Sequence, residues 1–166
     1  LSVVFNGDAS QLTALRAVSA GYPLRGNVMV SNEPFGPASP ADGVPGPGEV
    51  WPESRLAAAI GAGVGSELAI GAGMFRVTRI LISRPDQGAT LVELAPSLLM
   101  NHDDLPATQL IQPGSRMRYS LLFAGPREEV QSFSSWLKAH KQDGERLLDV
   151  EETAPHIRLD RGEDVV

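Results

Sequence analysis

Asn101-His102-Asp103-Asp104 is the part of this 166-residue sequence whose residue types come nearest to a metal site. An imidazole and two carboxylates can bind a divalent cation. Adjacent side chains seldom converge on one centre, so a metal site here needs further ligands, and neither His140 nor His156 can be assigned that role from sequence. A capping role for Asp103 or Asp104 at a short helix or turn is therefore the favoured interpretation.

Ser135 and Lys138 have the Ser-x-x-Lys spacing of acyl-serine enzymes, in which the lysine helps to activate the serine. The Ser-Asp-Asn and Lys-Thr-Gly elements that accompany this motif do not occur in the sequence, and neither does a Gly-x-Ser-x-Gly elbow. The pair is better explained as two polar residues on the surface of one helix. A serine hydrolase remains a rival hypothesis.

The glycine-rich stretch at 61–65, Gly-Ala-Gly-Val-Gly, invites comparison with a dinucleotide-binding loop. Such a loop must follow a strand and open a helix, so that the helix N-terminus can hold the pyrophosphate. Here the glycines follow a predicted helix and precede a predicted strand, which indicates a helix C-cap and a turn. The sequence also contains no Gly-Lys-Ser/Thr triplet, and this excludes a Walker-type ATPase from the chain.

Composition excludes several further classes. Twenty acidic residues against 14 basic ones give a net charge of −6, and no basic cluster runs along any segment, so nucleic acid and anionic membranes are poor partners. The absence of cysteine removes disulfides and thiol chemistry. No run approaches the roughly 20 apolar residues of a membrane-spanning helix.

The first third of the chain is predicted to be mostly extended. Asn6-Gly7 favours the turn of a β-hairpin between two short strands, and Pro23 between two glycines rules out regular structure at 21–26. The strands predicted here are 2–5, 12–18 and 28–30.

Residues 31–48 contain five prolines and are predicted to form a long loop facing a partner. Phe35 is the only large apolar residue with an aromatic ring in this loop. From composition alone, we expect deletion of the loop to leave the fold intact and to abolish partner binding.

The remaining elements are predicted from periodicity. A helix over 53–60 should bury Leu56, Ala59 and Ile60, and a second helix over 126–141 has an apolar stripe. Between and after them, the sequence predicts strands at 67–70, 75–83, 117–124 and 146–150, a strand that breaks into a short helix at Pro96 within 89–100, and a loop over 101–114. Because helices are too few to alternate with strands, this order favours an α+β fold.

Aromatic residues offer two interpretations. Trp51, Trp136, Phe133 and Phe123 are expected in the core, as aromatic residues at helical spacing usually are. Some aromatic residues that border irregular segments are instead candidates for an exposed contact with a partner. These candidate contact residues are Tyr22, Phe35 and Trp51.

Several blocks of the sequence resemble a known family. They are 18–26 (Val-Ser-Ala-Gly-Tyr-Pro-Leu-Arg-Gly), 50–56, 60–71 and, most specifically, 94–119, which includes Leu-Pro-Ala-Thr and Gln-Pro-Gly-Ser-Arg. Together they resemble the extracytoplasmic domain of bacterial ABC transporter permeases of the FtsX/MacB superfamily, in the YbbP-like branch.

This resemblance implies a MacB-like periplasmic core domain. Residues 1–30 and 115–166 would form a small membrane-proximal α+β lobe, and 31–114 would be a β-rich lobe inserted into it. The family's first lobe begins with an extra strand and helix, so we expect the chain to be a fragment whose membrane-proximal lobe is truncated at its N-terminus, with membrane segments flanking it in the parent permease.

The same resemblance implies a non-catalytic function. The domain would couple conformational change, driven by a cytoplasmic ABC ATPase through the permease's transmembrane segments, to a periplasmic protein or an apolar, lipid-like substrate. It implies no catalytic, cofactor-binding or metal-binding residue in this domain and a periplasmic location on a bacterial inner-membrane protein. The alternatives are a stand-alone periplasmic hydrolase and a small-molecule binding domain.

Overall fold

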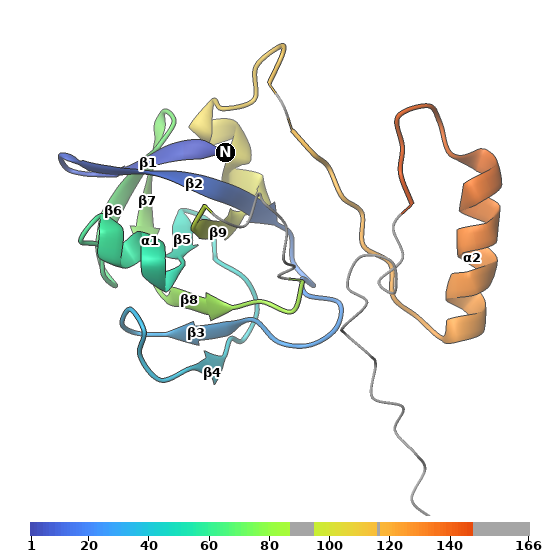
Figure 1. Ribbon diagram of the computed structural model, residues 1–166, viewed down its shortest axis with the longest axis horizontal. Coiled ribbons are helices and arrows are strands. Elements are labelled where there is room, and N and C mark those ends of the chain that lie inside the picture. The colour runs from blue at the N-terminus through green and yellow to red at the C-terminus, as the bar shows by residue number, and fades with distance from the viewer. Residues whose placement is uncertain (87–94, 116, 148–166) are drawn as a thin grey trace, which may run out of the picture. The chain divides into compact units, whose positions relative to one another are not determined.

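The computed structural model describes residues 1–86, 95–115 and 117–147. The chain divides into two compact units, Leu1–Leu122 and Phe123–Val166. The first unit contains a closed six-stranded barrel and a separate three-stranded sheet, and the described part of the second contains one helix (Figure 1). Strands therefore dominate the first unit.

The barrel is built from strands that lie far apart in the sequence. In order around the barrel they are β1 (Ser2–Asn6), β2 (Ala9–Val18), β9 (Ser97–Asn101), β5 (Glu49–Pro52), β7 (Gly73–Val77) and β6 (Glu67–Ile70). The pairs β2–β9 and β5–β7 are parallel, and the other neighbours are antiparallel. Strand β1 pairs with both β2 and β6, and this closes the sheet.

The hairpin predicted at the N-terminus is confirmed. Val3 lies opposite Leu12, and Asn6 lies opposite Ala9, so the turn falls at Gly7 and Asp8. Gly7 has a φ of 58°, which is the left-handed conformation that a tight hairpin turn requires.

Apolar side chains that point inward from the barrel strands form the larger core cluster. Helix α1 (Ser54–Ala59) adds Leu56 and Ala57 to this cluster, and Ile60 follows at its C-cap. Complete burial of a side chain such as Leu56 stabilises the fold by about 2 kcal/mol. The predicted helix is confirmed, but its buried face includes Ala57 rather than Ala59, which is exposed.

The glycine-rich stretch after α1 ends the helix, as predicted. Gly61, with a φ of 62°, follows the C-cap, and the Ala62 N–H donates to the Ala57 carbonyl at 2.8 Å while the Gly61 N–H reaches the Ala58 carbonyl at 3.4 Å. This is the Schellman arrangement, which satisfies carbonyls at a helix end. The stretch is therefore a cap and not the start of a nucleotide-binding helix.

A second sheet packs beside the barrel, with the order β4 (Ser39–Pro40), β3 (Met29–Ser31) and β8 (Ile80–Ser83). A single strand was predicted over 75–83. The structure has two strands there instead, β7 in the barrel and β8 in this sheet. A second core cluster joins the outer side of the barrel to the small sheet; it contains Val18, Tyr22, Val28, Val30, Trp51, Leu81 and Leu99.

Two predictions around Pro96 and the segment after it are wrong. The residues after Pro96 form strand β9, not a helix, because they pair with both β2 and β5. The predicted loop contains a 3₁₀ helix, η2 (His102–Thr108).

The N-cap of η2 is Asn101, whose side chain accepts a hydrogen bond from the Asp103 N–H at 2.9 Å, so Asn101 performs the capping role that was predicted for Asp103 or Asp104. Residues 89–94 of the predicted strand lie outside the described residues.

The C-terminal predictions have a mixed outcome. Helix α2 (Arg127–His140) is confirmed, but residues 117–124 form no strand, and Tyr119 and Leu121 are largely exposed. Phe123 and Trp136 are also exposed rather than part of a core. Residues 146 and 147 are not in a strand, and the rest of the strand predicted over 146–150 lies outside the described residues.

The compact units differ from the predicted lobes. The boundary expected after residue 30 falls within the first unit, because β1 and β2 belong to the same barrel as β5, β6, β7 and β9. The hydrogen-bonded ladder between β2 and β9 joins residues about eighty positions apart, a pairing that local sequence patterns do not reveal.

Candidate functional site

The metal candidate at 101–104 is part of the fold's own hydrogen bonding. His102 and Asp103 are exposed, with 3.6 Å between Nδ1 and Oδ1, whereas the Asp104 carboxylate accepts a hydrogen bond from the Gly48 N–H at 2.7 Å. Among the described residues, no group of three or more His, Cys, Asp or Glu side chains is placed to hold a metal ion. The arrangement instead anchors η2 to the end of the 31–48 segment.

The hydrolase candidates lie on α2 in the second unit. Ser135 and Lys138 are both exposed, and within the described part of the chain neither side chain makes a hydrogen bond to the other or to a third group. A serine nucleophile needs a base within hydrogen-bond reach and a group that orients that base. The described structure supplies neither at this pair.

Tyr22, a candidate contact residue, is buried in the second core cluster. Its hydroxyl donates to the Asp86 carboxylate at 2.6 Å, and the same carboxylate forms ion pairs with Arg16 and with Arg84, the latter at 3.3 Å. Burial, together with the hydrogen bond to Asp86, raises the pKa of the Tyr22 hydroxyl well above its usual range. The residue joins the segment after β2 to the segment after β8.

Trp51, the second candidate contact residue, is also buried in that cluster. Its indole N–H donates to the Thr78 hydroxyl at 3.0 Å, and the Thr78 hydroxyl donates to Glu49 at 3.1 Å. Buried tryptophans usually have such a partner for the indole nitrogen. Neither Trp51 nor Tyr22 offers its ring to a partner in this conformation.

Phe35 is the candidate contact residue that lies on the surface, with 69% of the residue exposed. It occupies a turn in which the Gly36 N–H donates to the Glu33 carbonyl at 3.1 Å. Pro34 precedes Phe35, whose φ is 59°. This is the pattern of a type II turn, whose third position favours glycine because φ is positive there.

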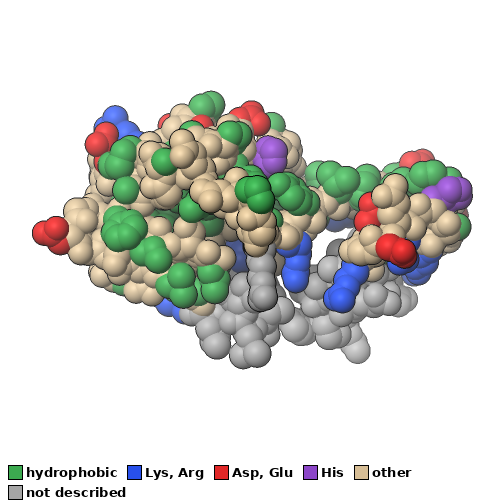
Figure 2. Space-filling view, turned by 90° about the horizontal axis from the view of Figure 1, so that it is seen from above, with side chains coloured by type: hydrophobic (Ala, Val, Ile, Leu, Met, Phe, Trp, Pro, Cys, Tyr) green, Lys and Arg blue, Asp and Glu red, His purple; other side chains and the backbone are tan. Residues whose placement is uncertain are grey.

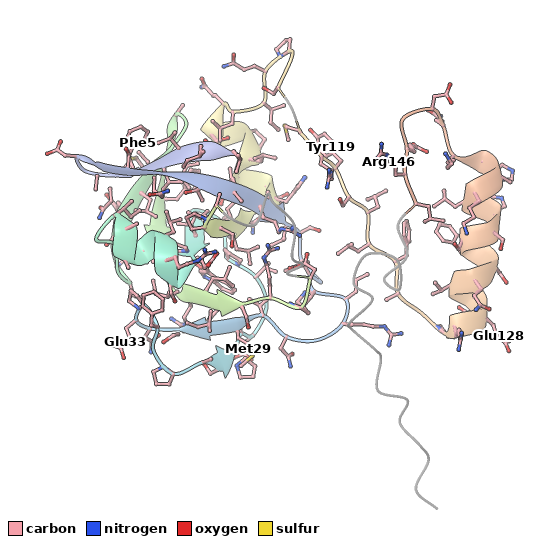
Figure 3. The ribbon with its side chains drawn as sticks, viewed as in Figure 1. Phe5, Met29, Glu33, Tyr119, Glu128 and Arg146 are labelled. Carbon is pink, nitrogen blue, oxygen red and sulfur yellow. The ribbon has the colours of Figure 1, made fainter. Side chains whose placement is uncertain are left out.

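The turn around Phe35 is fixed to the rest of the unit. The Phe35 N–H donates to the hydroxyl of Ser54, a buried residue at the start of α1, at 3.1 Å. The Ser31 hydroxyl accepts from the Glu33 N–H at 3.3 Å. Figure 3 shows Glu33 in the connection between β3 and β4, on the side of the small sheet opposite to Met29. The ring is therefore presented by a turn that has hydrogen bonds of its own and one to α1.

The rest of the 31–48 segment is also integrated into the fold. Strand β4 pairs with β3, the Ala41 N–H donates to the Val28 carbonyl at 2.9 Å, and the Asn101 side chain donates to the Pro45 carbonyl at 2.9 Å. Val44 packs against the second core cluster. These contacts lead us to expect, contrary to the prediction from composition, that deleting the segment would destabilise the fold, since its removal would expose that cluster.

An exposed apolar strip that was not predicted from the sequence lies on the outside of the barrel; it is formed by Val3, Phe5, Leu12 and Met74. Cross-strand pairs bring its members together, because Val3 lies opposite Leu12, and Phe5 lies opposite Ala69, which in turn lies opposite Met74. Hydrophobic side chains also reach the surface at several places on the face shown in Figure 2. The signal in the sequence was the apolar character of both faces of 2–5.

Comparison with known proteins identifies a relative. The uncharacterized ABC transporter permease YbbP of Escherichia coli (strain K12) is 28% identical to this chain over 151 residues. The matched residues are 91% of this chain and 18% of the permease, so the chain spans less than a fifth of its relative's length. No family model matches the chain, and no solved structure matches it.

The likeness therefore relates the chain to part of a protein named as an ABC transporter permease. None of the helices in the described residues combines the length and the apolar character needed to cross a membrane.

Proposed function

We propose that the chain is a non-catalytic, periplasmic domain of an ABC transporter permease. In this proposal it couples ATP-driven conformational change in the membrane to a periplasmic protein or an apolar, lipid-like substrate. The observation that carries the proposal is the likeness to the permease YbbP, which extends over 91% of the chain rather than over one short motif.

The arrangement of the candidate residues favours a binding role over a catalytic one. Tyr22 and Trp51 are satisfied core residues, Asp104 anchors a loop, and Ser135 lacks a base within reach among the described residues. Phe35 is exposed on a fixed turn. Such an arrangement suits a domain that makes different contacts in two states of a larger machine. A MacB-like fold, with the second unit as part of a membrane-proximal lobe, belongs to the same proposal.

The location is testable by cysteine labelling, because the chain has no cysteine of its own. Ala38→Cys, at an exposed position, would be introduced into the full-length gene product after replacement of any cysteine elsewhere in it. A membrane-impermeant maleimide added to cells with a permeabilised outer membrane is expected to label this cysteine. Val28→Cys, at a buried position, is the matched control and should react only after denaturation.

Coupling to ATP hydrolysis is tested in the same cells. Inactivation of the cognate ATPase is expected to change the labelling rate of Ala38→Cys, since the domain would then be held in one state. Labelling of Ala38→Cys only after the inner membrane is broken would overturn the periplasmic location. Identical rates with active and inactive ATPase, at this position and at others across the first unit, would overturn the coupling.

A further inference from the structure

The Phe35 turn combines a strained backbone with a side chain that the described fold does not use. Among the described residues, Phe35 and Gln109 are the two non-glycine residues with positive φ. Gln109 is the C-cap of η2, where a left-handed residue is common. Phe35 does not lie at a helix C-cap, and a positive φ is a genuine outlier for a residue with a bulky side chain.

Nothing in the turn requires an aromatic side chain at position 35. The turn is closed by backbone atoms of Glu33 and Gly36, and its link to α1 uses the Phe35 N–H rather than the ring. Gly36, by contrast, has little room for a side chain, because a Cβ there would lie 2.5 Å from the Ser31 hydroxyl and 2.5 Å from the Glu33 side chain, one of which would have to move. Glycine or asparagine at position 35 would form the same turn with less strain.

We infer that the Phe35 ring is an anchor that inserts into an apolar pocket of a partner protein. An exposed aromatic residue on a hydrogen-bonded turn needs little ordering of the backbone on binding, and aromatic residues are typical of those that dominate the affinity of an interface. Backbone strain of this kind persists where a function outside the local fold requires it. The inference deepens the proposed function, on which it rests, by naming the residue and the chemistry of the contact.

The charge of the segment favours a protein over a membrane surface as the partner. Residues 31–48 contain two acidic side chains, Glu33 and Asp42, and no basic one, so an anionic lipid surface would repel them. A protein pocket lined by aliphatic side chains, with a neutral or basic rim, is complementary to an aromatic ring beside carboxylates.

The first test separates the ring's role from the fold by stability measurements on the 166-residue chain. Phe35→Ala removes the ring and keeps the backbone strain, whereas Phe35→Asn removes the ring and relieves the strain. We expect Phe35→Asn to have a Tm about 3 °C above that of Phe35→Ala and no lower than that of the original chain. Phe5 is the matched control, because it is an exposed phenylalanine on a regular strand, and Phe5→Asn should not exceed Phe5→Ala in Tm. A large loss of stability in both Phe35 variants would show that the ring serves the fold and would overturn the anchor.

The second test identifies what the ring touches. The photoreactive substitution Phe35→p-benzoylphenylalanine would be placed in the full-length gene product in cells, with the same residue at Asp42, an exposed position in the same segment, as the control. We expect an adduct with one protein from position 35, with the linked peptide rich in apolar side chains, and no such adduct from position 42. Adducts with lipid, equal adducts from both positions, or none from position 35 would each overturn the proposal.

The contribution of the Phe35 ring to binding is then measured as the affinity of the chain and its Phe35 variants for the captured partner. With that partner purified, Phe35→Ala and Phe35→Asn should both weaken binding by roughly 30-fold, although one is the more stable protein. Unchanged affinity in both would overturn the anchor. Labelling of Ala38→Cys from the periplasmic side together with failure at position 35 removes only this inference, whereas failure of that labelling removes the proposed function itself.

Discussion

Glu53 is a buried carboxylate that holds two elements together. It lies between β5 and α1, and its Oε2 accepts hydrogen bonds from the Ser97 N–H at 2.9 Å and from the Ser97 hydroxyl at 3.1 Å, at the first residue of β9. Its Oε1 accepts from Arg55 Nε at 2.7 Å. Burial alone would raise the pKa of Glu53, but the hydrogen bonds from Arg55 and Ser97 outweigh burial and lower the pKa below the usual 4.5.

The lowered pKa predicts a stability that depends on acid pH. A carboxylate whose pKa is lower in the folded state stabilises that state fully above the unfolded pKa of 4.5, and this contribution is lost as the pH falls through the folded pKa. Glu53→Gln should therefore reduce the free energy of unfolding by about 2 kcal/mol at neutral pH, and the difference from the original chain should shrink below pH 4.5. Urea unfolding across this pH range measures it.

A matched control for this change is Glu67→Gln at an exposed position of β6. It should alter the free energy of unfolding by less than about 0.5 kcal/mol. If the difference between Glu53→Gln and the original chain were the same at acid and neutral pH, the hydrogen bonds to Ser97 would not depend on the charge of Glu53, and the interpretation would be wrong.

Single residues also show where sequence reasoning about the site succeeds and where it fails. The exposure of Phe35 was predictable, because it is an isolated ring in a proline-rich segment, and its contact with a partner stays a prediction. Tyr22 and Trp51 have equally irregular neighbours, but their polar partners, Asp86 and Thr78, are 64 and 27 residues away. Only the packing of the small sheet on the barrel brings these pairs together, so the sequence did not separate the buried rings from the exposed one.

At the scale of elements, the β6–β7 turn approaches the end of η2 closely enough to require glycine. A Cβ on Gly71 would lie 2.0 Å from the Thr108 carbonyl oxygen, and the Ala72 N–H donates to the same oxygen at 2.8 Å. Gly71 has a φ of 58°, the same value as Gly7 in the β1–β2 turn, where a Cβ would meet nothing within 4 Å. An alanine at Gly7 would therefore meet backbone strain alone, whereas an alanine at Gly71 would meet the same strain and a steric clash.

This pair of glycines gives a prediction with a built-in control. Gly7→Ala should lower the free energy of unfolding by about 1 kcal/mol, the cost of a left-handed alanine. Gly71→Ala carries the same strain and must also displace a backbone carbonyl, so it should cost about 3 kcal/mol or more. Chemical denaturation of both variants measures the difference. Equal losses would mean that η2 moves away at little cost, and its contact with the turn would then contribute little to the fold.

The elements that were predicted correctly are those whose formation depends on residues close together in the sequence. The first hairpin has a glycine in its turn, α1 has a glycine after its end, and α2 has an apolar stripe, and all three elements are present. The division of 75–83 into β7 and β8 depends on pairing with two different sheets. Residues 117–124 have the alternation of a strand, but within the described chain no other strand pairs with them. Pattern alone does not supply a pairing partner.

At the scale of the whole molecule, the buried apolar residues of the described chain all lie between Val4 and Leu105. They form the two clusters inside the barrel and between the barrel and the small sheet. Helix α2 contributes no buried residue, although Phe123, Phe133, Trp136 and His140 form a ladder of ring contacts along it. The stability of the first unit should therefore not depend on the second.

A chain that ends at Ser115 is accordingly expected to keep the fold of the barrel and the small sheet. It retains every strand of the described residues and both core clusters, so it should unfold in one cooperative transition with a Tm within about 3 °C of that of the 166-residue chain. A chain that ends at Asp86 is the matched control: it lacks β9, which pairs with β2 and β5, so the barrel cannot close and no cooperative transition should remain. Calorimetry and circular dichroism would measure both. Loss of cooperativity in the chain ending at Ser115 would show that the barrel needs residues after 115, and the expectation that the two core clusters suffice for the fold would be wrong.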